Sequence, residues 1–205
     1  PVEYIDNAIL SSRGPHPKNV VLLTADAFGV LPPIARLSVP QAMYHFLSGY
    51  TAKLAGTEAG VTQPKATFST CFGEPFLPLP PMTYAKMLGE LVVKHKAQCW
   101  LINTGWTGGG YGTGKRMSLE HTRTMVRAAL AGQLANAKFT PDPIFGLPIP
   151  DAVPGVPATV LNPRNTWKEG AEYEKAAKEL AGLFRKNFER FAGVTPEVLA
   201  AGPKS

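Results

Sequence analysis

The sequence contains little cysteine, little charge and no long apolar run. Cys71 and Cys99 are its only cysteines, and two cannot build a disulfide framework, so a reducing compartment such as the cytoplasm is expected. Charged residues make up 18% of the chain and hydrophobic residues 44%, a balance that argues against a disordered chain. No apolar run approaches the length of a membrane span. The sequence therefore predicts a globular chain without a membrane segment.

Glycine and proline, by contrast, are abundant, with 20 of each among 205 residues. They stand between apolar runs and follow no fixed period, which excludes collagen-like and linker sequences and indicates a loop-rich globular chain. The length fits one domain with a sizeable core. The chain begins at Pro1, and Tyr4 and Ile5 resemble part of a folded segment. We therefore expect a piece of a longer chain, cut inside a domain.

Short apolar runs alternate with amphipathic segments along the chain. Residues 19–24 and 98–103 are apolar on both faces, as in strands buried within a sheet. Ser38 and Gln41 form a capping-box pattern that predicts a helix to about Tyr50. Other expected elements are a strand with its exit loop over 68–76, helices over 83–96, 118–131 and 172–191, and an irregular proline-rich connection over 141–163. This alternation predicts a mixed α/β protein.

Helical spacing predicts which side chains of two of these helices enter the core. In the helix over 83–96 they are Tyr84, Met87, Leu88 and Leu91. In the helix over 172–191 they are Tyr173, Ala176, Ala177, Leu180, Leu183, Phe184 and Phe188.

Asp26 directly follows the first predicted strand, at its carboxyl end. Ligands of open α/β sheets collect at that edge, so a ligand role is one interpretation. An aspartate that caps the following turn is an equally weighted alternative. Arg36 lies nearby in sequence and could hold a phosphate or a carboxylate, although a structural ion pair is at least as good an interpretation.

The strongest local signal is the glycine-rich segment after the strand over 98–103. Gly109 to Lys115 fits the phosphate-loop pattern G-x-x-x-x-G-K. The next residue, Arg116, cannot ligate Mg²⁺ as a serine or threonine would, so an authentic phosphate loop is the weakest interpretation. A structural glycine loop is a stronger one, and a nucleotide-contacting loop of another kind is favoured, because Lys115 and Arg116 precede a helix N-terminus and favour a polyanion.

Several other residue types give weaker signals. The hydroxyl of Thr122 could face the ligand of that loop, or it could bond its own helix carbonyl. The four histidines show no metal-ligand spacing with each other or with a cysteine, and Cys71 and Cys99 lie in apolar settings typical of core thiols. Lysine and arginine are dispersed along the chain, which argues against a nucleic-acid-binding surface.

Long strings of the sequence resemble ATP-dependent phosphoenolpyruvate carboxykinases. In the order of that family, they are Leu23-Thr24-Ala25-Asp26-Ala27-Phe28-Gly29-Val30-Leu31-Pro32-Pro33, the run from Tyr44 to Glu58, Phe68-Ser69-Thr70-Cys71-Phe72-Gly73, Asn103-Thr104-Gly105-Trp106, Gly114-Lys115-Arg116-Met117-Ser118 and Leu161-Asn162-Pro163-Arg164-Asn165-Thr166. The resemblance covers nearly the whole chain.

The resemblance implies a carboxy-lyase that converts oxaloacetate and ATP to phosphoenolpyruvate, ADP and CO₂ in gluconeogenesis. Residues 1–205 would be the latter part of the C-terminal mononucleotide-binding domain. The N-terminal domain, the phosphate loop and the ligands of Mg²⁺ and Mn²⁺ would belong to the remainder of the same polypeptide. It further implies a cytoplasmic enzyme with small-molecule substrates and no nucleic-acid or membrane partner, a monomer with a dimer as the alternative, and a segment that is inactive alone.

The resemblance assigns the adenosine-side contacts to ATP to Arg116, Met117 and Thr122. It assigns no catalytic residue and no metal ligand to this segment. It also argues that Gly109 to Lys115 is not the triphosphate cradle, although a stand-alone phosphate-binding module using that loop remains the alternative function. Many family members have a shorter bridge than residues 107–112 here, so the path of the loop stays open. The roles of Asp26, Arg36, Lys53 and Tyr111 are likewise unassigned.

Overall fold

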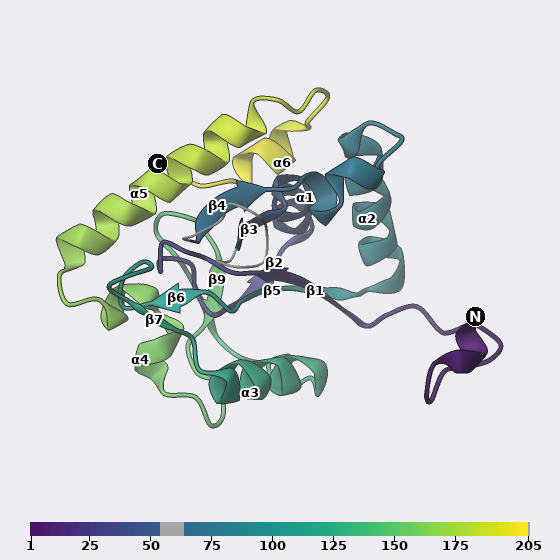
Figure 1. Cartoon of the computed structure of the whole chain (residues 1–205), viewed down its shortest axis with the longest axis horizontal. Helices are drawn as coiled ribbons and strands as arrows, with labels where there is room; N and C mark the ends of the chain where they lie inside the picture. The colour runs from purple at the N-terminus through teal and green to yellow at the C-terminus, as the bar shows by residue number, and fades with distance from the viewer. Residues whose placement is uncertain (54–63, 205) are drawn as a thin grey trace.

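A three-stranded sheet forms the centre of the computed structural model, which describes residues 1–53 and 64–204 (Figure 1). Strand β5 (Gln98–Asn103) lies between β1 (Asn19–Thr24) and β2 (Ile34–Leu37). It runs parallel to β1 and antiparallel to β2. Both predicted strands are therefore confirmed, and they are neighbours in one sheet. The predicted burial holds for the central strand β5, whereas β1 lies at the edge of the described sheet and exposes Val21 and Leu23. Residues 54–58 of the second matched string lie outside the described residues.

The two faces of this sheet enter two different apolar clusters. Along β5, Cys99 and Leu101 belong to the larger cluster, whereas Trp100 and Ile102 belong to the smaller one. This alternation follows from the period of two of a strand, and it explains why β5 is apolar on both faces. The sheet is thus the middle of a layered α/β structure, and the predicted fold class is confirmed.

Helices cover the two faces of the sheet unequally. On the side of the larger cluster lie α1 (Val39–Ser48), α2 (Pro81–His95), α5 (Gly170–Phe188) and α6 (Pro196–Ala200). On the side of the smaller cluster lie α3 (Leu119–Leu130) and α4 (Ala158–Leu161), seen below the sheet in Figure 1. Among the described residues, no helix is long and apolar enough to cross a membrane.

The predicted capping box at the start of α1 is confirmed. The Ser38 hydroxyl accepts from the Gln41 amide, and the Gln41 side chain accepts from the Ser38 amide. The helix ends at Ser48 rather than near Tyr50, because Gly49 turns into the left-handed region with φ of 53°. A Cβ at Gly49 would meet the carbonyl oxygen of Ser69, so this close backbone approach also requires glycine.

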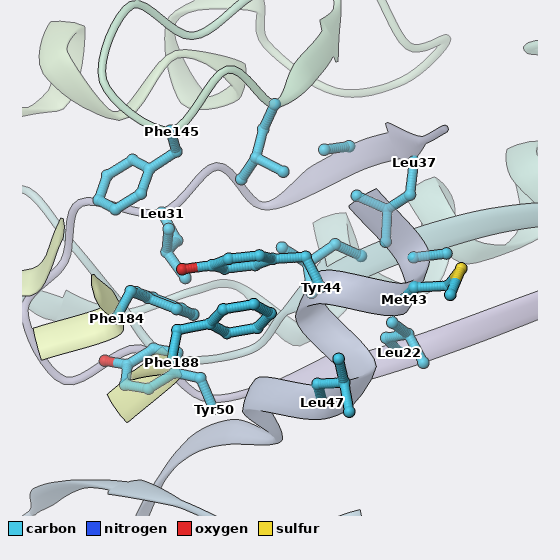
Figure 2. Close-up of a cluster of buried hydrophobic side chains, with 14 of the residues drawn as sticks. Leu22, Leu31, Leu37, Met43, Tyr44, Leu47, Tyr50, Phe145, Phe184 and Phe188 are labelled. Atoms are coloured by element: carbon cyan, nitrogen blue, oxygen red, sulfur yellow. The ribbon is translucent and has the colours of Figure 1, made fainter. Parts of the chain in front are cut away.

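Tyr44 of α1 packs against aromatic residues of α5 within the larger cluster. Figure 2 shows Tyr44 beside Phe184 and Phe188. The rings of Tyr44 and Phe188 stack with centroids 4.0 Å apart. The predicted apolar stripe of α5 is confirmed at its centre, since Tyr173, Ala177, Leu180, Phe184 and Phe188 are all buried.

The predicted inward face of α2 is partly wrong. Met87 and Leu91 are 51% and 46% exposed, whereas Gly89 and Val92 are buried. A Cβ at Gly89 would lie 2.9 Å from the Met43 sulfur of α1. Because glycine has no side chain, the face of α2 that contains Gly89 can pack directly on α1. The contact face is therefore centred on a residue that carries no apolar side chain.

The remaining elements are short. They are η1 (Val2–Tyr4), β3 (Tyr50–Lys53) paired with β4 (Lys65–Phe68), η2 (Thr70–Phe72), η3 (Glu74–Phe76), β6 (Trp106–Thr107) paired with β7 (Lys115–Arg116), β8 (Phe139–Pro141) paired with β9 (Pro148–Pro150), and η4 (Pro163–Thr166). The predicted strand with its exit loop over 68–76 is wrong in its position. The strand β4 already ends at Phe68, and Cys71 and Phe72 adopt positive φ and form a helical turn after it.

Candidate functional site

The carboxyl ends of the parallel strands β1 and β5 meet at one edge of the sheet, where the side chain of Asn103 joins the two exits. Its Oδ1 accepts from the amides of Asp26 (3.0 Å) and Gly105 (2.8 Å), and its Nδ2 donates to the carbonyl of Leu31 (2.9 Å). Asn103 is fully buried. It therefore fixes the loop after β1 against the loop after β5, at the edge where α/β proteins carry their ligand-binding loops.

Asp26 is buried at this edge and caps the turn after β1. Its carboxylate accepts from the amides of Phe28, Val30 and Leu31 and from the Tyr50 hydroxyl, at 2.7–2.9 Å. Burial raises the pKa of Asp26, and these donated hydrogen bonds act in the opposite direction. Since four protein donors surround a fully buried carboxylate, the turn-capping interpretation describes Asp26 better than the ligand interpretation.

Replacing Tyr50 with phenylalanine tests this view of Asp26. The change removes one donor from a buried carboxylate, so we expect the free energy of unfolding to fall by about 1.5–3 kcal/mol. Chemical denaturation of the full-length variant measures the loss. Tyr111→Phe, which removes a hydroxyl from a 47% exposed ring, is the matched control and should change stability by less than about 0.5 kcal/mol. Equal losses in both variants would contradict a role of Tyr50 in holding the Asp26 carboxylate.

The glycine-rich segment after β5 forms a β-hairpin. Trp106 and Thr107 of β6 pair with Arg116 and Lys115 of β7, and residues 108–114 connect the two strands. The amide of Trp106 donates to the Asp26 carbonyl (2.8 Å) and the amide of Tyr111 donates to the Ala27 carbonyl (3.0 Å). The hairpin is thus attached to the turn that Asp26 caps.

Two glycines allow this attachment because the backbones approach too closely for a side chain. A Cβ on Gly105 would lie 2.2 Å from both the amide nitrogen and the carbonyl oxygen of Asp26. A Cβ on Gly29, whose φ is 74°, would lie 2.1 Å from the Gly109 carbonyl oxygen. The glycine content of both loops therefore serves the packing of one loop on the other.

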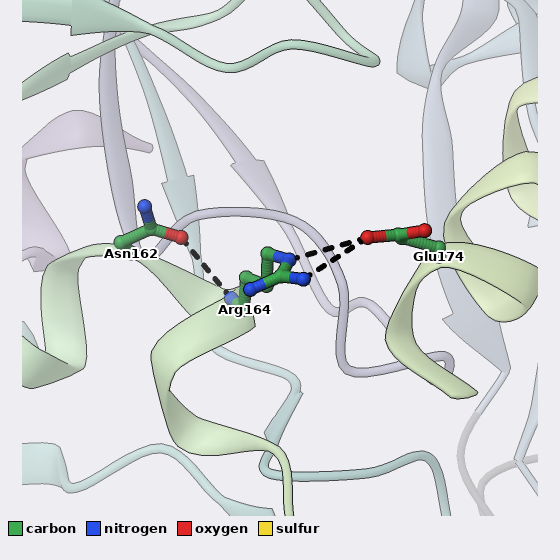
Figure 3. Close-up of polar contacts among 3 residues, drawn as sticks. All are labelled: Asn162, Arg164 and Glu174. Atoms are coloured by element: carbon green, nitrogen blue, oxygen red, sulfur yellow. Dashed lines mark hydrogen bonds and ion pairs between the residues drawn. The ribbon is translucent and has the colours of Figure 1, made fainter. Parts of the chain in front are cut away.

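The other side of the hairpin packs on the segment from Leu161 to Thr166, the last of the family-like strings. The Thr166 hydroxyl bonds to the Thr107 hydroxyl and accepts from the Gly108 amide, both at 2.9 Å. Thr166 follows Arg164, which forms an ion pair with Glu174 of α5, and the Asn162 side chain accepts from the Arg164 amide (Figure 3). The ion pair is half-exposed, so its main effect is positional: it ties the segment that carries Thr166 to α5.

This arrangement differs from a phosphate loop. Lys115 and Arg116 lie in a strand, and the helix begins only at Leu119 after the Ser118 cap, whereas a phosphate loop places its lysine at the start of the helix. The amides of Gly108, Tyr111, Thr113 and Gly114 donate to protein oxygens. The loop is therefore a braced hairpin, in agreement with the expectation that Gly109 to Lys115 is not a triphosphate cradle.

The three residues assigned to ATP by resemblance follow one another from β7 into α3. Arg116 is exposed, its Nε donates to the Thr104 carbonyl (3.0 Å), and its Cζ lies 4.8 Å from the centre of the Trp106 ring. Met117 is buried, and its amide donates to the Gly105 carbonyl (2.9 Å). Thr122 is half-buried and its hydroxyl donates to the Ser118 carbonyl (3.0 Å), which is the alternative contact considered for it. Their contacts with ATP stay predictions.

The residues without an assigned role lie in different places. Arg36 is in β2, within the sheet, and its guanidinium stacks on Phe139 with Cζ 4.0 Å from the ring centre. Lys53 ends β3. Tyr111 contacts the Trp106 ring edge to face, with centroids 5.7 Å apart. Of these three residues, Tyr111 alone contacts the Trp106 ring that also contacts Arg116.

Metal-ligating residue types are scattered in the described ranges. Among residues 1–53 and 64–204, no group of three or more His, Cys, Asp or Glu side chains is placed to hold a metal ion. Cys71 and Cys99 are buried, and burial raises the pKa of both thiols to about 11. These thiols are core side chains, as their sequence settings predict.

The position of Trp106 opposite Arg116 was not predicted from the sequence. The glycine segment was expected to be a loop before a helix, and a loop gives Trp106 no cross-strand partner. One weak signal could have indicated the hairpin: the glycine-rich stretch over 108–114 is flanked by Trp106-Thr107 and Lys115-Arg116, two short segments of bulky residues that can pair across a long loop.

The exposed Arg116 of this hairpin lies beside the carboxyl end of β5, the edge at which open α/β sheets bind their ligands. The chain belongs to the phosphoenolpyruvate carboxykinase family, whose model, described as phosphoenolpyruvate carboxykinase, matches residues 1–159. The resemblance expected from the sequence strings is thereby confirmed.

Curated relatives extend the match to the rest of the chain. The chain is 62% identical over 98% of its length to phosphoenolpyruvate carboxykinase (ATP) 1 of Moorella thermoacetica, and 61% identical over 100% to phosphoenolpyruvate carboxykinase (ATP) of Caldanaerobacter subterraneus. It is 59% identical over 98% to the enzyme of that name in Lysinibacillus sphaericus. The chain spans 38% or 39% of the length of these relatives.

Proposed function

We propose that this chain is the nucleotide-binding portion of an ATP-dependent phosphoenolpyruvate carboxykinase. The complete enzyme would convert oxaloacetate and ATP to phosphoenolpyruvate, ADP and CO₂, in the cytoplasm and in gluconeogenesis. The family membership and identities near 60% to relatives that bear this name support the proposal. Residues 1–205 are proposed as the latter part of its C-terminal mononucleotide-binding domain, and the working form as a monomer.

The observation that carries the ATP assignment is the orientation of the exposed Arg116 side chain. Its side chain is exposed at the carboxyl edge of the sheet, yet its guanidinium is held by the Thr104 carbonyl and the Trp106 ring. An oriented guanidinium can stack on a base or donate to a ribose oxygen. Thr122 is half-buried one turn into α3, and its hydroxyl can still accept a hydrogen bond while it donates to the Ser118 carbonyl. Met117 is buried between these two residues, so Arg116 is the main group offered to the adenosine end of ATP.

Bound ATP supplies the phosphoryl group, and divalent Mg²⁺ and Mn²⁺ would neutralise its charge, as phosphoryl transfer generally requires. We propose that the side chains that bind these metals, and those that bind oxaloacetate, belong to the remainder of the polypeptide. In this segment, residues 116–122 would then orient the nucleotide without taking part in the chemical step.

Strand β1 exposes two apolar side chains on one face of the sheet, which supports the proposal that the remainder of the polypeptide packs there. Val21 and Leu23 of β1 are 39% and 57% exposed. They lie opposite Trp100 and Ile102 of β5, which are completely buried on the same face. Since isolated apolar strand faces are unfavourable in water, we propose that other parts of the full-length chain cover Val21 and Leu23.

Leu23→Asp in the full-length enzyme tests this partner surface. If the face is covered, the substitution buries a charge in place of a leucine, and we expect a loss of at least about 2 kcal/mol in unfolding free energy. Met87→Asp on α2, at 51% exposure, is the control and should cost less than about 1 kcal/mol. Thermal and urea denaturation report both changes. Similar stability of the two variants would show that the β1 face stays in water.

The experiment that tests the proposed activity is formation of phosphoenolpyruvate from oxaloacetate by the full-length enzyme. We expect product to form with ATP and Mg²⁺ plus Mn²⁺, and none to form when ATP is omitted. Absence of product with every substrate present would contradict the proposal. If instead ATP binds and binding is lost only in Lys115→Ala, the alternative phosphate-binding module would replace it.

A further inference from the structure

Trp106 and Arg116 form a cross-strand pair at the base of the hairpin. They lie directly opposite each other in the antiparallel register of β6 and β7, so their side chains project from the same face. Cζ of Arg116 lies 4.8 Å from the centre of the Trp106 ring. Trp106 is 7% exposed, whereas Arg116 is exposed. A buried ring thus carries a charged group that stays open to solvent.

A second contact limits how the guanidinium can turn on that ring. The Nε of Arg116 donates to the carbonyl oxygen of Thr104 (3.0 Å), and Thr104 is itself bonded to the end of β1 through the Thr24 carbonyl. A planar guanidinium stacked on a ring and bonded through Nε has lost most of its rotational freedom. In the described part of the chain, no protein acceptor takes its terminal nitrogens, so these remain available to a ligand.

The long loop of the hairpin contacts the same indole. Tyr111 meets the Trp106 ring edge to face, with an interplanar angle of 86°. Its amide is bonded to the Ala27 carbonyl, which fixes the loop over the turn after β1. The residues that lengthen this loop therefore bring a second aromatic ring against Trp106.

We propose that Trp106 is a positioning residue for ATP binding, which acts by holding the Arg116 guanidinium in the orientation that receives the adenosine, and that Tyr111 supports Trp106 from the loop. This inference rests on the proposed function and adds Trp106 to it, as a residue that affects ATP affinity through Arg116. Without the ring, Arg116 keeps its charge and its sequence position but gains rotational freedom that ATP binding must then remove.

The expected effect is one on nucleotide affinity. Exposed cation–π contacts have strengths that correspond to roughly two- to five-fold in an equilibrium constant. Trp106→Leu in the full-length enzyme should therefore raise the KM for ATP about two- to five-fold while leaving kcat and the KM for oxaloacetate unchanged. Trp106→Phe keeps a ring opposite Arg116 and should restore most of the affinity.

A double-mutant cycle separates positioning from a general effect on folding. Trp106→Leu is combined with Arg116→Ala, and the KM for ATP is measured for both single variants and for the pair. If Trp106 acts through Arg116, its removal has no further effect once Arg116 is alanine. If Trp106→Leu raises the KM equally in both backgrounds, or lowers kcat and thermal stability without changing the KM, the proposal is wrong.

The control uses a second pair of the same kind elsewhere in the chain. Phe139→Leu removes the ring under the Arg36 guanidinium and should leave the KM for ATP unchanged. A rise equal to that of Trp106→Leu would overturn the specific role of Trp106. If Arg116→Ala alone leaves the KM for ATP unchanged, the proposed function of the site itself fails, an outcome that the cycle reports separately.

Discussion

Arg116→Ala in the full-length enzyme is expected to raise the KM for ATP roughly 10- to 100-fold, the range that corresponds to losing hydrogen bonds from a charged group. The guanidinium would contact ATP equally in the ground state and the transition state, because it lies at the adenosine end and away from the transferred phosphoryl group. Its loss should therefore change the KM for ATP and spare both kcat and the KM for oxaloacetate. Initial rates at varied ATP and saturating oxaloacetate measure the effect.

Two neighbouring variants make this result specific. Arg123→Ala removes an exposed arginine next to Thr122 on the same helix and should leave the KM for ATP within about two-fold, as for most exposed substitutions. Lys115→Ala removes the other cation of β7. An unchanged ATP dependence in Arg116→Ala would remove Arg116 from the site, and a large effect in Lys115→Ala alone would favour the phosphate-module alternative.

Gly105→Ala is expected to destabilise the full-length chain by about 3 kcal/mol, near the upper range for forcing atoms into a packed region. The added Cβ would lie 2.2 Å from backbone atoms of Asp26, and backbone cannot rotate away as a side chain can. The loop after β5 must shift, which displaces Trp106 and the Met117 amide that bonds the Gly105 carbonyl. We therefore expect a raised KM for ATP together with the loss of stability, measured by urea denaturation and by kinetics.

Gly182→Ala is the matched control for this substitution. Gly182 lies in the interior of α5, and nothing outside the helix backbone lies within 4 Å of a Cβ there. Because alanine is a better helix former than glycine, this variant should be more stable by about 0.5–1 kcal/mol. The same substitution thus has opposite signs at the two sites. A Gly105→Ala variant as stable as the parent would show that the loops after β1 and β5 are not in close contact.

The parts of the fold that local sequence determines could be predicted. Strands β1 and β5 are continuous apolar runs, and the central stripe of α5 repeats at helical spacing. The start of α1 follows from Ser38 and Gln41, which cap their own backbone. Each of these features depends on residues close together in the chain, and for this reason a single sequence shows them.

The features that could not be predicted depend on contacts between distant segments. The face of α2 is chosen by the approach of Gly89 to Met43, and Met87 and Leu91 are left exposed by it. Asp26 finds one of its four donors in Tyr50, a pairing without local signature. The position of the β6–β7 hairpin is likewise fixed by close backbone contact between Gly29 and Gly109. The family resemblance therefore pointed to Arg116 and Thr122 as candidate ATP contacts, but nothing in the sequence placed the Trp106 ring beneath Arg116.

We propose that residues 116–122, at the edge where β1 and β5 end, hold the adenosine of ATP. Amide hydrogen exchange of the full-length enzyme, compared with and without saturating ATP, tests it most directly. We expect slower exchange across β7 and the first turn of α3 when ATP is bound, and loss of that protection in Arg116→Ala. Unchanged exchange over 115–122 while ATP is bound would contradict it.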